Sequence, residues 1–396
     1  MNAPGGTAQG RAFGRLRAWA RTPETLEHGG LVWLALVVGL FMLLPAATPR
    51  PGIVLWGLVL AGTLLLSLRF RIGPLALVAL VVAGIGIRFV MVDAGWSDVL
   101  RVTSAAIDQV LAGHSPWGIR YQGSNPPGAS FPYGPLALFW YLPLRATPVA
   151  MEFVGSALIL VVLALRGRPL GLAVFALAPA LAVVASDGSN DTGASLFLLA
   201  AVLLMQRSPR WGGVALALAA AFKVYALAWL PGLLWWGGLP ALIGFGAASL
   251  AVWGPALLAW GTGAFLYSFA LSQSVHAQAY YSLGYALQSV GIRVDPEALD
   301  RLRLVLGGGV AVIGARLGRT GRGVVVAGLA VYVVTLYTGS WSTFSYLATI
   351  APLVCWHVED WVGLGERRVR WPGDPVGQFS GWVDARWPLL GRVASV

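Results

Sequence analysis

Charged side chains are scarce in this chain of 396 residues. Asp, Glu, Lys and Arg together make up 11% of it, whereas soluble globular proteins contain about 25%. Hydrophobic residues make up 57% of the chain, and its mean hydropathy is +0.73. The chain therefore lacks the polar surface that it would need to cover itself in water, which argues against a soluble domain.

Cysteine is nearly absent, and several functional motifs are missing. The single cysteine, Cys355, lies in an apolar run and allows no internal disulfide, so cysteine usage does not reveal the redox compartment. No Gly-rich phosphate-binding loop precedes the single lysine, Lys223, and there is no Asp-x-Asp pair and no His/Cys cluster with metal-ligand spacing. We therefore predict no metal and no cofactor, and we expect that any group the protein transfers arrives on a lipid rather than on a cytosolic nucleotide.

Most of the sequence consists of long apolar runs separated by short arginine clusters. Many of these runs approach the length needed to cross about 30 Å of hydrocarbon. The net charge of +11 would suit a nucleic-acid partner, but arginines placed between apolar runs are typical of the cytoplasmic loops of membrane proteins. We therefore predict an all-α, polytopic transmembrane helix bundle with about ten to twelve spans, membrane lipids around it and no nucleic acid bound.

The positions of the arginines predict a topology in the plasma membrane with both termini in the cytoplasm. Residues 1–30 are expected to form a disordered basic leader, 31–358 the transmembrane domain and 359–396 a cytoplasmic tail. The predicted external loops are about 93–131, 187–191 and 261–302. The predicted spans are 31–47, 52–68, 72–92, 149–165, 169–186, 192–206, 239–260, 303–317, 322–338 and 343–358, with a broken hairpin around Lys223 at 211–236.

Residues 132–144 are the exception to simple counting of spans. Thirteen residues with three prolines are too short to cross the bilayer, and treating them as a span would place the later arginine pairs outside. We therefore expect this segment to dip into the membrane and return.

An amphipathic helix is expected in the first external loop, from Ser97 as N-cap to Gly113. Asp98, Arg101 and Asp108 share its polar stripe, and such a helix would lie flat at the interface with its apolar face in lipid and its polar face towards a cavity. Asp98 could then act as a general base, or it could be an aspartate that only favours the start of the helix. Both interpretations stay open.

Ionisable residues inside apolar segments form the second group of candidates. Lys223 is the only lysine in the chain, and an ammonium facing a cavity would suit a lipid-linked phosphate. It could instead be a snorkelling side chain or part of an internal ion pair. Arg88, near the outer end of the third predicted span, suggests the same role more weakly.

Polar and aromatic loop residues complete the candidates. Asp187, Asn190 and Asp191 could bind hydroxyl groups or a cation, or could simply form a tight turn. Tyr133 lies in a rigid aromatic loop and could stack on a sugar or belong to an interfacial aromatic belt. His276 lies among the aromatics and amides of 261–302 and fits a polar loop residue better than a catalyst.

Several motifs occur in an order that resembles glycosyltransferase family 87 of the GT-C superfamily of integral membrane glycosyltransferases, whose members include polyprenol-phosphate-mannose-dependent mannosyltransferases. The resemblance covers roughly residues 90–235. The motifs are Ser97-Asp98 before an interfacial helix, Ala112-Gly113-His-Ser-Pro116-Trp117, Pro132-Tyr133-Gly-Pro135, Ser189-Asn190-Asp191, and a small-residue helix ending in Phe222-Lys223-Val-Tyr225.

This resemblance implies transfer of a sugar (mannose, or another hexose or pentose) from a polyprenyl-phosphate donor to a hydroxyl of a lipid or glycan acceptor, on the extracytoplasmic side and with inversion. By this resemblance Asp98 is the base. Lys223, with Arg101 or Arg88, would stabilise the departing lipid phosphate. The remaining site candidates are Tyr133, Asp187, Asn190, Asp191, Tyr225 and His276.

The sequence departs from the family in two places, and other functions stay open. Two extra spans precede the first external loop, and the turn at 339–346 lacks the histidine of some relatives. A transporter or flippase is the main alternative, but it would favour paired broken helices in a pseudo-symmetric second half, and no duplicate of the Asp98 or Lys223 segment is present. A non-enzymatic membrane scaffold is the third possibility.

Overall fold

The computed structural model describes residues 73–90, 97–125, 127–205, 207–275, 281–317, 320–339, 342–343 and 345–361, and the single positions 378, 382, 385 and 386. The predicted leader, the first two predicted spans and most of the predicted tail lie outside these residues. Within them, the regular structure is helical, with 14 α-helices and no strand. This confirms the all-α prediction.

Most of the helices follow one another with short connections, and a long loop at 112–134 joins α5 to α6. In chain order they are α4 (Pro74–Val90), α5 (Val99–Leu111), α6 (Pro135–Tyr141), α7 (Val149–Leu165), α8 (Pro169–Leu177), α9 (Pro179–Val184), α10 (Asp191–Met205), α11 (Pro209–Phe222), α12 (Leu230–Trp260), α13 (Thr262–Val275), α14 (Leu283–Ser289), α15 (Pro296–Leu317), α16 (Gly321–Tyr337) and α17 (Ser345–Trp361), with 3-10 helices at Leu142–Leu144 and Val224–Trp229.

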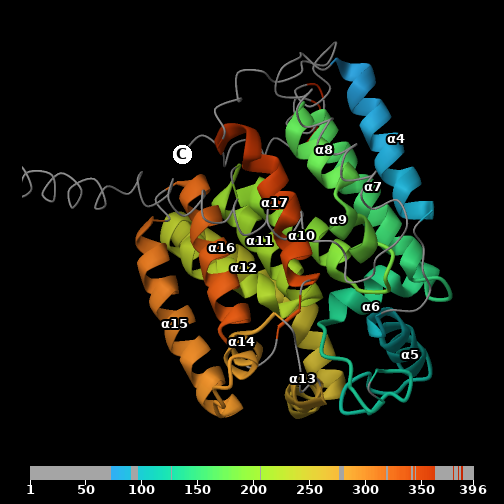
Figure 1. Ribbon diagram of the computed structural model, residues 1–396, viewed down its shortest axis with the longest axis vertical. Helices are drawn as coiled ribbons and strands as arrows, with labels where there is room; N and C mark the ends of the chain where they lie inside the picture. Colours follow the sequence, from blue (N-terminus) through green and yellow to red (C-terminus); the bar gives the residue numbers. More distant parts are fainter. Residues whose placement is uncertain are drawn as a thin grey trace, which may run out of the picture.

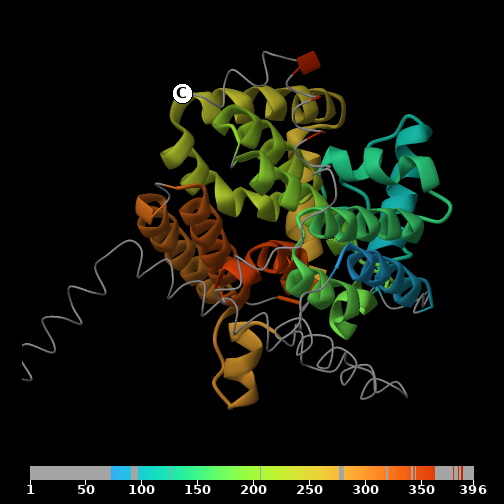
Figure 2. The same cartoon turned by 90° about the horizontal axis from the view of Figure 1, so that it is seen from above.

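Helices distant in the sequence pack together in the centre of the bundle. Helix α10 packs against α7, α11 and α17, helix α8 joins α4 to α17, and α12 packs against α11, α15 and α16. In two perpendicular views α4 and α15 lie on opposite sides of the bundle (Figures 1 and 2). Helices α5, α13 and α14 gather at one end (Figure 1), and the candidate site lies near that end.

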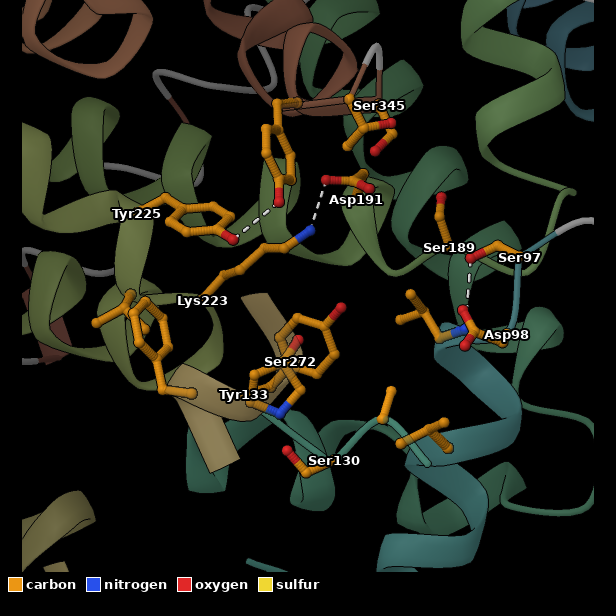
Figure 3. Close-up of a pocket in the computed structure, with 18 of the residues that line it drawn as sticks. Ser97, Asp98, Ser130, Tyr133, Ser189, Asp191, Lys223, Tyr225, Ser272 and Ser345 are labelled. Atoms are coloured by element: carbon orange, nitrogen blue, oxygen red, sulfur yellow. Dashed lines mark hydrogen bonds and ion pairs between the residues drawn. The ribbon is translucent and has the colours of Figure 1, made fainter. Parts of the chain in front are cut away.

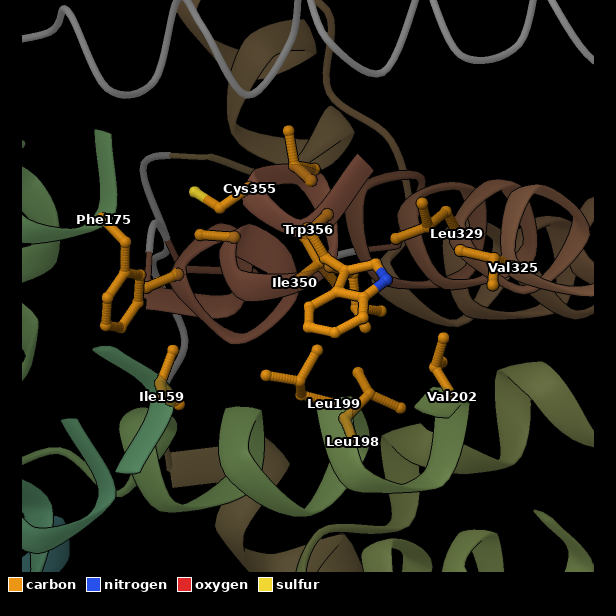
Figure 4. Close-up of a cluster of buried hydrophobic side chains, with 14 of the residues drawn as sticks. Ile159, Phe175, Leu198, Leu199, Val202, Val325, Leu329, Ile350, Cys355 and Trp356 are labelled. Atoms are coloured by element: carbon orange, nitrogen blue, oxygen red, sulfur yellow. The ribbon is translucent and has the colours of Figure 1, made fainter. Parts of the chain in front are cut away.

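The main hydrophobic core lies where α10 meets α16 and α17. Leu198, Leu199 and Val202 of α10 lie opposite Ile350 and Trp356 of α17 and the aliphatic side chains of α16 (Figure 4). Close helix contacts are possible because small residues leave room for backbone to approach backbone. Gly171 of α8, for example, has no space for a side chain, because the carbonyl of Cys355 in α17 occupies it.

Several helix boundaries match the predicted spans closely. Helix α7 occupies the predicted residues 149–165, and α10 begins one residue before the predicted span 192–206. The predicted span 169–186 is two helices, because the backbone is extended at Ala178 before Pro179. Proline cannot donate the next helical hydrogen bond, and it disfavours a helical residue before it.

The segment 261–302, predicted to be external, is largely helical in its described part, and its place relative to the membrane stays a prediction. It contains α13 and α14, and α15 already begins at Pro296. These helices were not predicted, because they contain many polar and aromatic residues and the spans were predicted from long apolar runs. Helix α12 is also longer than the predicted span 239–260 and bends at Gly238, where φ is 56° and ψ is −145°.

By length and hydropathy, one described stretch, Val224–Trp260, is long and apolar enough to cross a bilayer. A second is obtained if Pro135–Leu144 and Val149–Leu165, which meet at a bend of 102°, are counted as one broken span or re-entrant loop. A bend of this kind occurs both in a broken span and in a re-entrant loop, so the expectation that 132–144 turns back stays a prediction. The number of spans stays a prediction.

Candidate functional site

A cavity of about 310 Å³ lies among segments that are far apart in the sequence. Its walls come from the start of α5 and the loop that follows α5, the loop before α10, the turn after α11, helix α13, and the turn before α17. Six of the predicted site residues line it: Asp98, Tyr133, Asp187, Asp191, Lys223 and Tyr225. Figure 3 shows Lys223 and Asp98 on opposite sides of this space.

Lys223 lies where α11 ends. Its backbone is extended, with φ −141° and ψ 117°, so the helix stops and a 3-10 turn begins at the next residue. Its Nζ donates a hydrogen bond to Oδ1 of Asp191 at 2.6 Å, and its side chain is only 6% exposed. The internal ion pair left open by the sequence is therefore present, and it lies on the cavity wall.

Asp191 is the first residue of α10 and binds two elements at once. Its Oδ1 accepts hydrogen bonds from Lys223 and from Oγ1 of Thr349 in α17, the latter at 2.7 Å. A carboxylate at a helix N-terminus is also stabilised by the helix dipole. The ammonium is thus held by a fixed partner rather than by a flexible one.

Three tyrosines surround the Lys223 ammonium. Its Nζ lies 5.6 Å from the ring centroid of Tyr133, 5.9 Å from that of Tyr225 and 5.5 Å from that of Tyr346, within the range of cation–π attraction. The hydroxyls of Tyr225 and Tyr346 are hydrogen-bonded to each other at 2.9 Å. Aromatic faces and hydroxyl groups therefore meet around the only lysine.

The backbone of Tyr133 is fixed relative to that of Lys223. The amide of Gly134 donates to the carbonyl of Phe222 at 3.4 Å, and a side chain at Gly134 would overlap the carbonyl of Ala221. The loop that contains Tyr133 and the end of α11 therefore touch without space between them.

Asp98 lies on the opposite wall, just before α5. Its Oδ2 accepts a hydrogen bond from the amide of Asn125 at 2.6 Å, and its side chain makes no capping bond to the helix. Ser97, predicted as the N-cap, does accept the amide of Val99 with its Oγ at 3.4 Å, while Asp98 is the residue that directly precedes the helix. Asp98 is therefore turned towards the cavity and not towards the helix end.

Asp187 is the third carboxylate of the cavity. Its Oδ1 accepts the amide of Ser189 at 2.8 Å. Burial, opposed by the hydrogen bonds from Ser189, raises the pKa of Asp187 from 3.8 to about 7. The amides of Ser97 and Leu100 donate to the carbonyls of Asp187 and Gly188 at 2.7 and 2.9 Å, so this loop also fixes the start of α5.

Three predicted site residues do not line the cavity. Arg88 is fully buried and donates to the carbonyls of Gly84, Phe175 and Ala176, which fixes α4 to α8. Arg101 is exposed on the outer side of α5. Asn190 is buried, and both polar atoms of its amide lack a hydrogen-bond partner among the described residues. His276 lies outside the described residues.

The orientation of α5 also corrects the sequence interpretation. Val102 and Ala106 pack into a protein cluster with α6 and the Trp117 loop, so this face covers the protein and does not lie in lipid. Asp108, on the predicted polar stripe, pairs with Arg145 at 2.7 Å at the surface. Of the stripe, Asp98 alone lines the cavity.

Sequence reasoning missed several polar residues in and behind the cavity. Tyr346 and Thr349 lie in the last predicted span, where no local pattern marks them. Glu152 is a fully buried acid in α7, and an acid inside an apolar run is the same signal that singled out Lys223. In the described part of the chain, no group of three or more His, Cys, Asp or Glu residues could hold a metal ion.

No protein-family model, no curated protein and no solved structure matches the chain.

Proposed function

We propose that this protein is a polytopic membrane glycosyltransferase of the GT-C type. It transfers a sugar (mannose, or another hexose or pentose) from a polyprenyl-phosphate donor to a lipid or glycan acceptor on the extracytoplasmic side of the cell membrane. The observation that supports this most directly is that Asp98 and Lys223 line one cavity from opposite sides.

The distribution of side chains supports a membrane location. Large apolar residues are exposed on the outer helices, for example Leu258 at 90%, Val305 at 71% and Val312 at 64%. Ionisable residues are buried inside, including Glu152 and Arg168, both at 0% exposure. Water would favour the reverse distribution, whereas a bilayer favours apolar side chains outside and paired polar groups inside.

The composition of the cavity suits a sugar. Hydroxyl groups come from Ser130, Tyr225, Ser272 and Ser345, among others, and the ring of Tyr133 offers an apolar face. Its volume of about 310 Å³ is at the small end of small-molecule sites. We therefore expect the cavity to enclose the reacting sugar unit and the phosphate, with the polyprenyl chain outside it.

In the proposed reaction, Asp98 removes the proton of the acceptor hydroxyl while the acceptor oxygen bonds to the anomeric carbon. The bond between that carbon and the phosphate oxygen breaks on the opposite face, which inverts the centre. The electron pair leaves on the polyprenyl phosphate, beside Lys223 and the tyrosine hydroxyls. Fixed donors at the place where charge develops are a strong source of catalysis.

Replacing Asp98 with Asn tests the proposal. The amide keeps the side-chain shape but cannot take the proton, so we expect transfer to fall by about 100-fold or more. The measurement is formation of labelled glycolipid in membranes supplied with a polyprenyl-phosphate sugar, with donor binding followed separately. Asp108→Asn is the matched control, because Asp108 lies on α5, the helix that Asp98 directly precedes, but does not line the cavity and pairs with Arg145.

Two results would contradict the proposal. One is wild-type transfer by Asp98→Asn at normal expression. The other is substrate uptake by proteoliposomes of the wild-type protein with no new glycosidic product, which would indicate a transporter or flippase.

A further inference from the structure

Glu152, in the first turn of α7, is completely buried and is surrounded by hydrogen-bond donors. Its Oε1 accepts the hydroxyl of Tyr141 at 2.5 Å. Its Oε2 accepts the amide of Thr192 at 2.9 Å, and the amide of Gly193 lies 3.1 Å from both oxygens. The carboxylate thereby joins the end of α6, the start of α7 and the start of α10.

The two amides belong to the first turn of α10. The first N–H groups of a helix have no partner within the helix, and an acidic side chain that accepts them also interacts favourably with the helix dipole. Asp191, which holds the Lys223 ammonium, is the residue immediately before Thr192. Fixing the amides of Thr192 and Gly193 therefore fixes the backbone from which the Asp191 carboxylate projects.

The packing around Gly193 joins both sides of this ion pair. A Cβ atom at Gly193 would lie 2.9 Å from Oε1 of Glu152, 2.9 Å from Cζ of Phe222 and 3.1 Å from the hydroxyl of Tyr141. Phe222 directly precedes Lys223 in the chain. The buried acid, the helix start with Asp191 and the helix end with Lys223 are thus in one close-packed cluster.

We infer that Glu152 is a positioning residue that sets the place of the Lys223 ammonium in the cavity, acting through the first turn of α10 and Asp191. Its importance for sugar transfer rests on the proposed function, whereas the geometric claim does not.

Lys223 itself provides the test, because it is the only lysine in the chain. The full-length protein in detergent is treated with a small amine-acylating reagent, and the labelling rate of the Lys223 peptide is measured by mass spectrometry. The α-amino group lies in a different peptide and serves as an internal reference. The free energy lost with a hydrogen bond to a charged group changes an equilibrium constant about tenfold. We therefore expect Glu152→Ala to raise the labelling rate of Lys223 about tenfold.

The controls separate positioning from a general loss of packing. Ser156→Ala changes a buried residue one turn along α7 whose hydroxyl has no hydrogen-bond partner among the described residues, and it should leave the labelling rate unchanged. Asp191→Asn should raise the rate as much as Glu152→Ala. Glu152→Gln should restore much of the wild-type rate, because its amide oxygen can still accept the amides of Thr192 and Gly193.

If Glu152→Ala does not fold, Tyr141→Phe keeps the inference testable. The free energy lost with one neutral hydrogen-bond donor changes an equilibrium constant about fivefold, so the labelling rate of Lys223 should rise by about that factor. A labelling rate in the folded Glu152 or Tyr141 variant that equals the rate in Ser156→Ala would overturn the inference.

A double-mutant cycle on transfer tests the connection to catalysis. Introduced alone, Glu152→Ala should lower kcat. Introduced into the Lys223→Met variant, it should have almost no further effect, because Glu152 acts through the Lys223 ammonium. Equal losses in both backgrounds would contradict positioning through Lys223. If the wild-type protein transfers no sugar but the variants show the expected changes in Lys223 labelling, the proposed function is refuted and the inference still holds.

Discussion

At the scale of single residues, Lys223 and Asp191 form a buried pair whose members depend on each other. Their side chains are 6% and 3% exposed. Removing one partner of a buried pair leaves the other charge without compensation, which typically costs about 3 to 5 kcal/mol. The effect of changing either residue alone therefore includes this penalty, and double-mutant cycles are needed to isolate a role in chemistry.

Asp187 makes the stability of the protein depend on pH near neutrality. Because burial raises its pKa from 3.8 to about 7, the folded protein binds this proton more tightly than the unfolded chain does. The resulting stabilisation is fully present below pH 3.8 and is lost as the pH rises through about 7. A shift of this size corresponds to about 4 kcal/mol.

We therefore expect the free energy of unfolding to fall between about pH 4 and pH 8, and Asp187→Asn to remove most of this dependence. The amide keeps the acceptor for Ser189 and loses the titrating proton. Denaturant unfolding in detergent at several pH values measures both proteins. Equal pH slopes for the two proteins would contradict the assignment.

The sequence predicted the residues of the cavity with uneven success for a physical reason. An ionisable group in an apolar run must find a polar environment, but the sequence does not say which one. Lys223 lies at the cavity, whereas Arg88 satisfies its guanidinium with the carbonyls of a neighbouring helix. Glu152 of α7 accepts the amide of Thr192 at the start of α10, and these two segments come together only in the folded protein.

At the scale of elements, the loop between α9 and α10 is the support for α5. Its carbonyls at Asp187 and Gly188 accept the amides of Ser97 and Leu100. Gly188 has a φ of +89°, and a Cβ atom there would lie 2.8 Å from the carbonyl oxygen of Ser97. The position of Asp98, which follows Ser97, therefore depends on a glycine in a different part of the chain.

Gly188→Ala should strain the backbone by about 1 to 2 kcal/mol and also displace the start of α5. We expect sugar transfer to fall by about tenfold to 100-fold, because small misplacements of a catalytic group have effects of this size. Gly113→Ala is the matched control: Gly113 has a similar φ of +80°, but nothing lies within 4 Å of its Cβ position.

Thermal unfolding and transfer rates of the two variants are then compared. Both should lose stability through backbone strain, Gly188→Ala more because its Cβ also meets the Ser97 carbonyl, and only Gly188→Ala should lose activity. Equal activities would show that the contact with Ser97 does not position Asp98.

Helix boundaries were predictable where apolar length and arginine clusters agreed. Helix α7 occupies the predicted residues, and it is separated from the segment before it by a bend of 102°. Helices α13 and α14 were not predicted, because their polar and aromatic residues resemble a loop and only the fold gives them partners. The face of α5 was assigned to lipid for a related reason: its apolar pattern does not distinguish protein from lipid.

At the scale of the whole molecule, exposed apolar side chains follow the outer helices over most of their length. On α15 they include Leu304, Val305, Val312 and Ile313, each more than 60% exposed. If this face lies in hydrocarbon, a charge placed there must be pulled into the bilayer. If it lies in water, the same charge is harmless.

Val312→Arg distinguishes these environments. We expect it to oppose insertion by about 2.5 to 3.5 kcal/mol and to reduce the yield of folded protein extracted from membranes. Val290→Arg is the control, because Val290 is 70% exposed but lies after α14 in the predicted external segment, where water can hydrate the charge. Equal yields for both variants would argue that α15 does not face lipid.

The contact between Gly134 and the carbonyl of Ala221 also limits how this scaffold can diversify. The wall formed by Tyr133 and Lys223 is built from two touching backbones, so it can neither widen nor accept a larger residue without moving two segments at once. Helix α13, by contrast, presents the side chains of Phe269 and Ser272 to the same space. A descendant of this protein that adopted a bulkier substrate would therefore be expected to change α13 and to inherit the Gly134 wall unaltered.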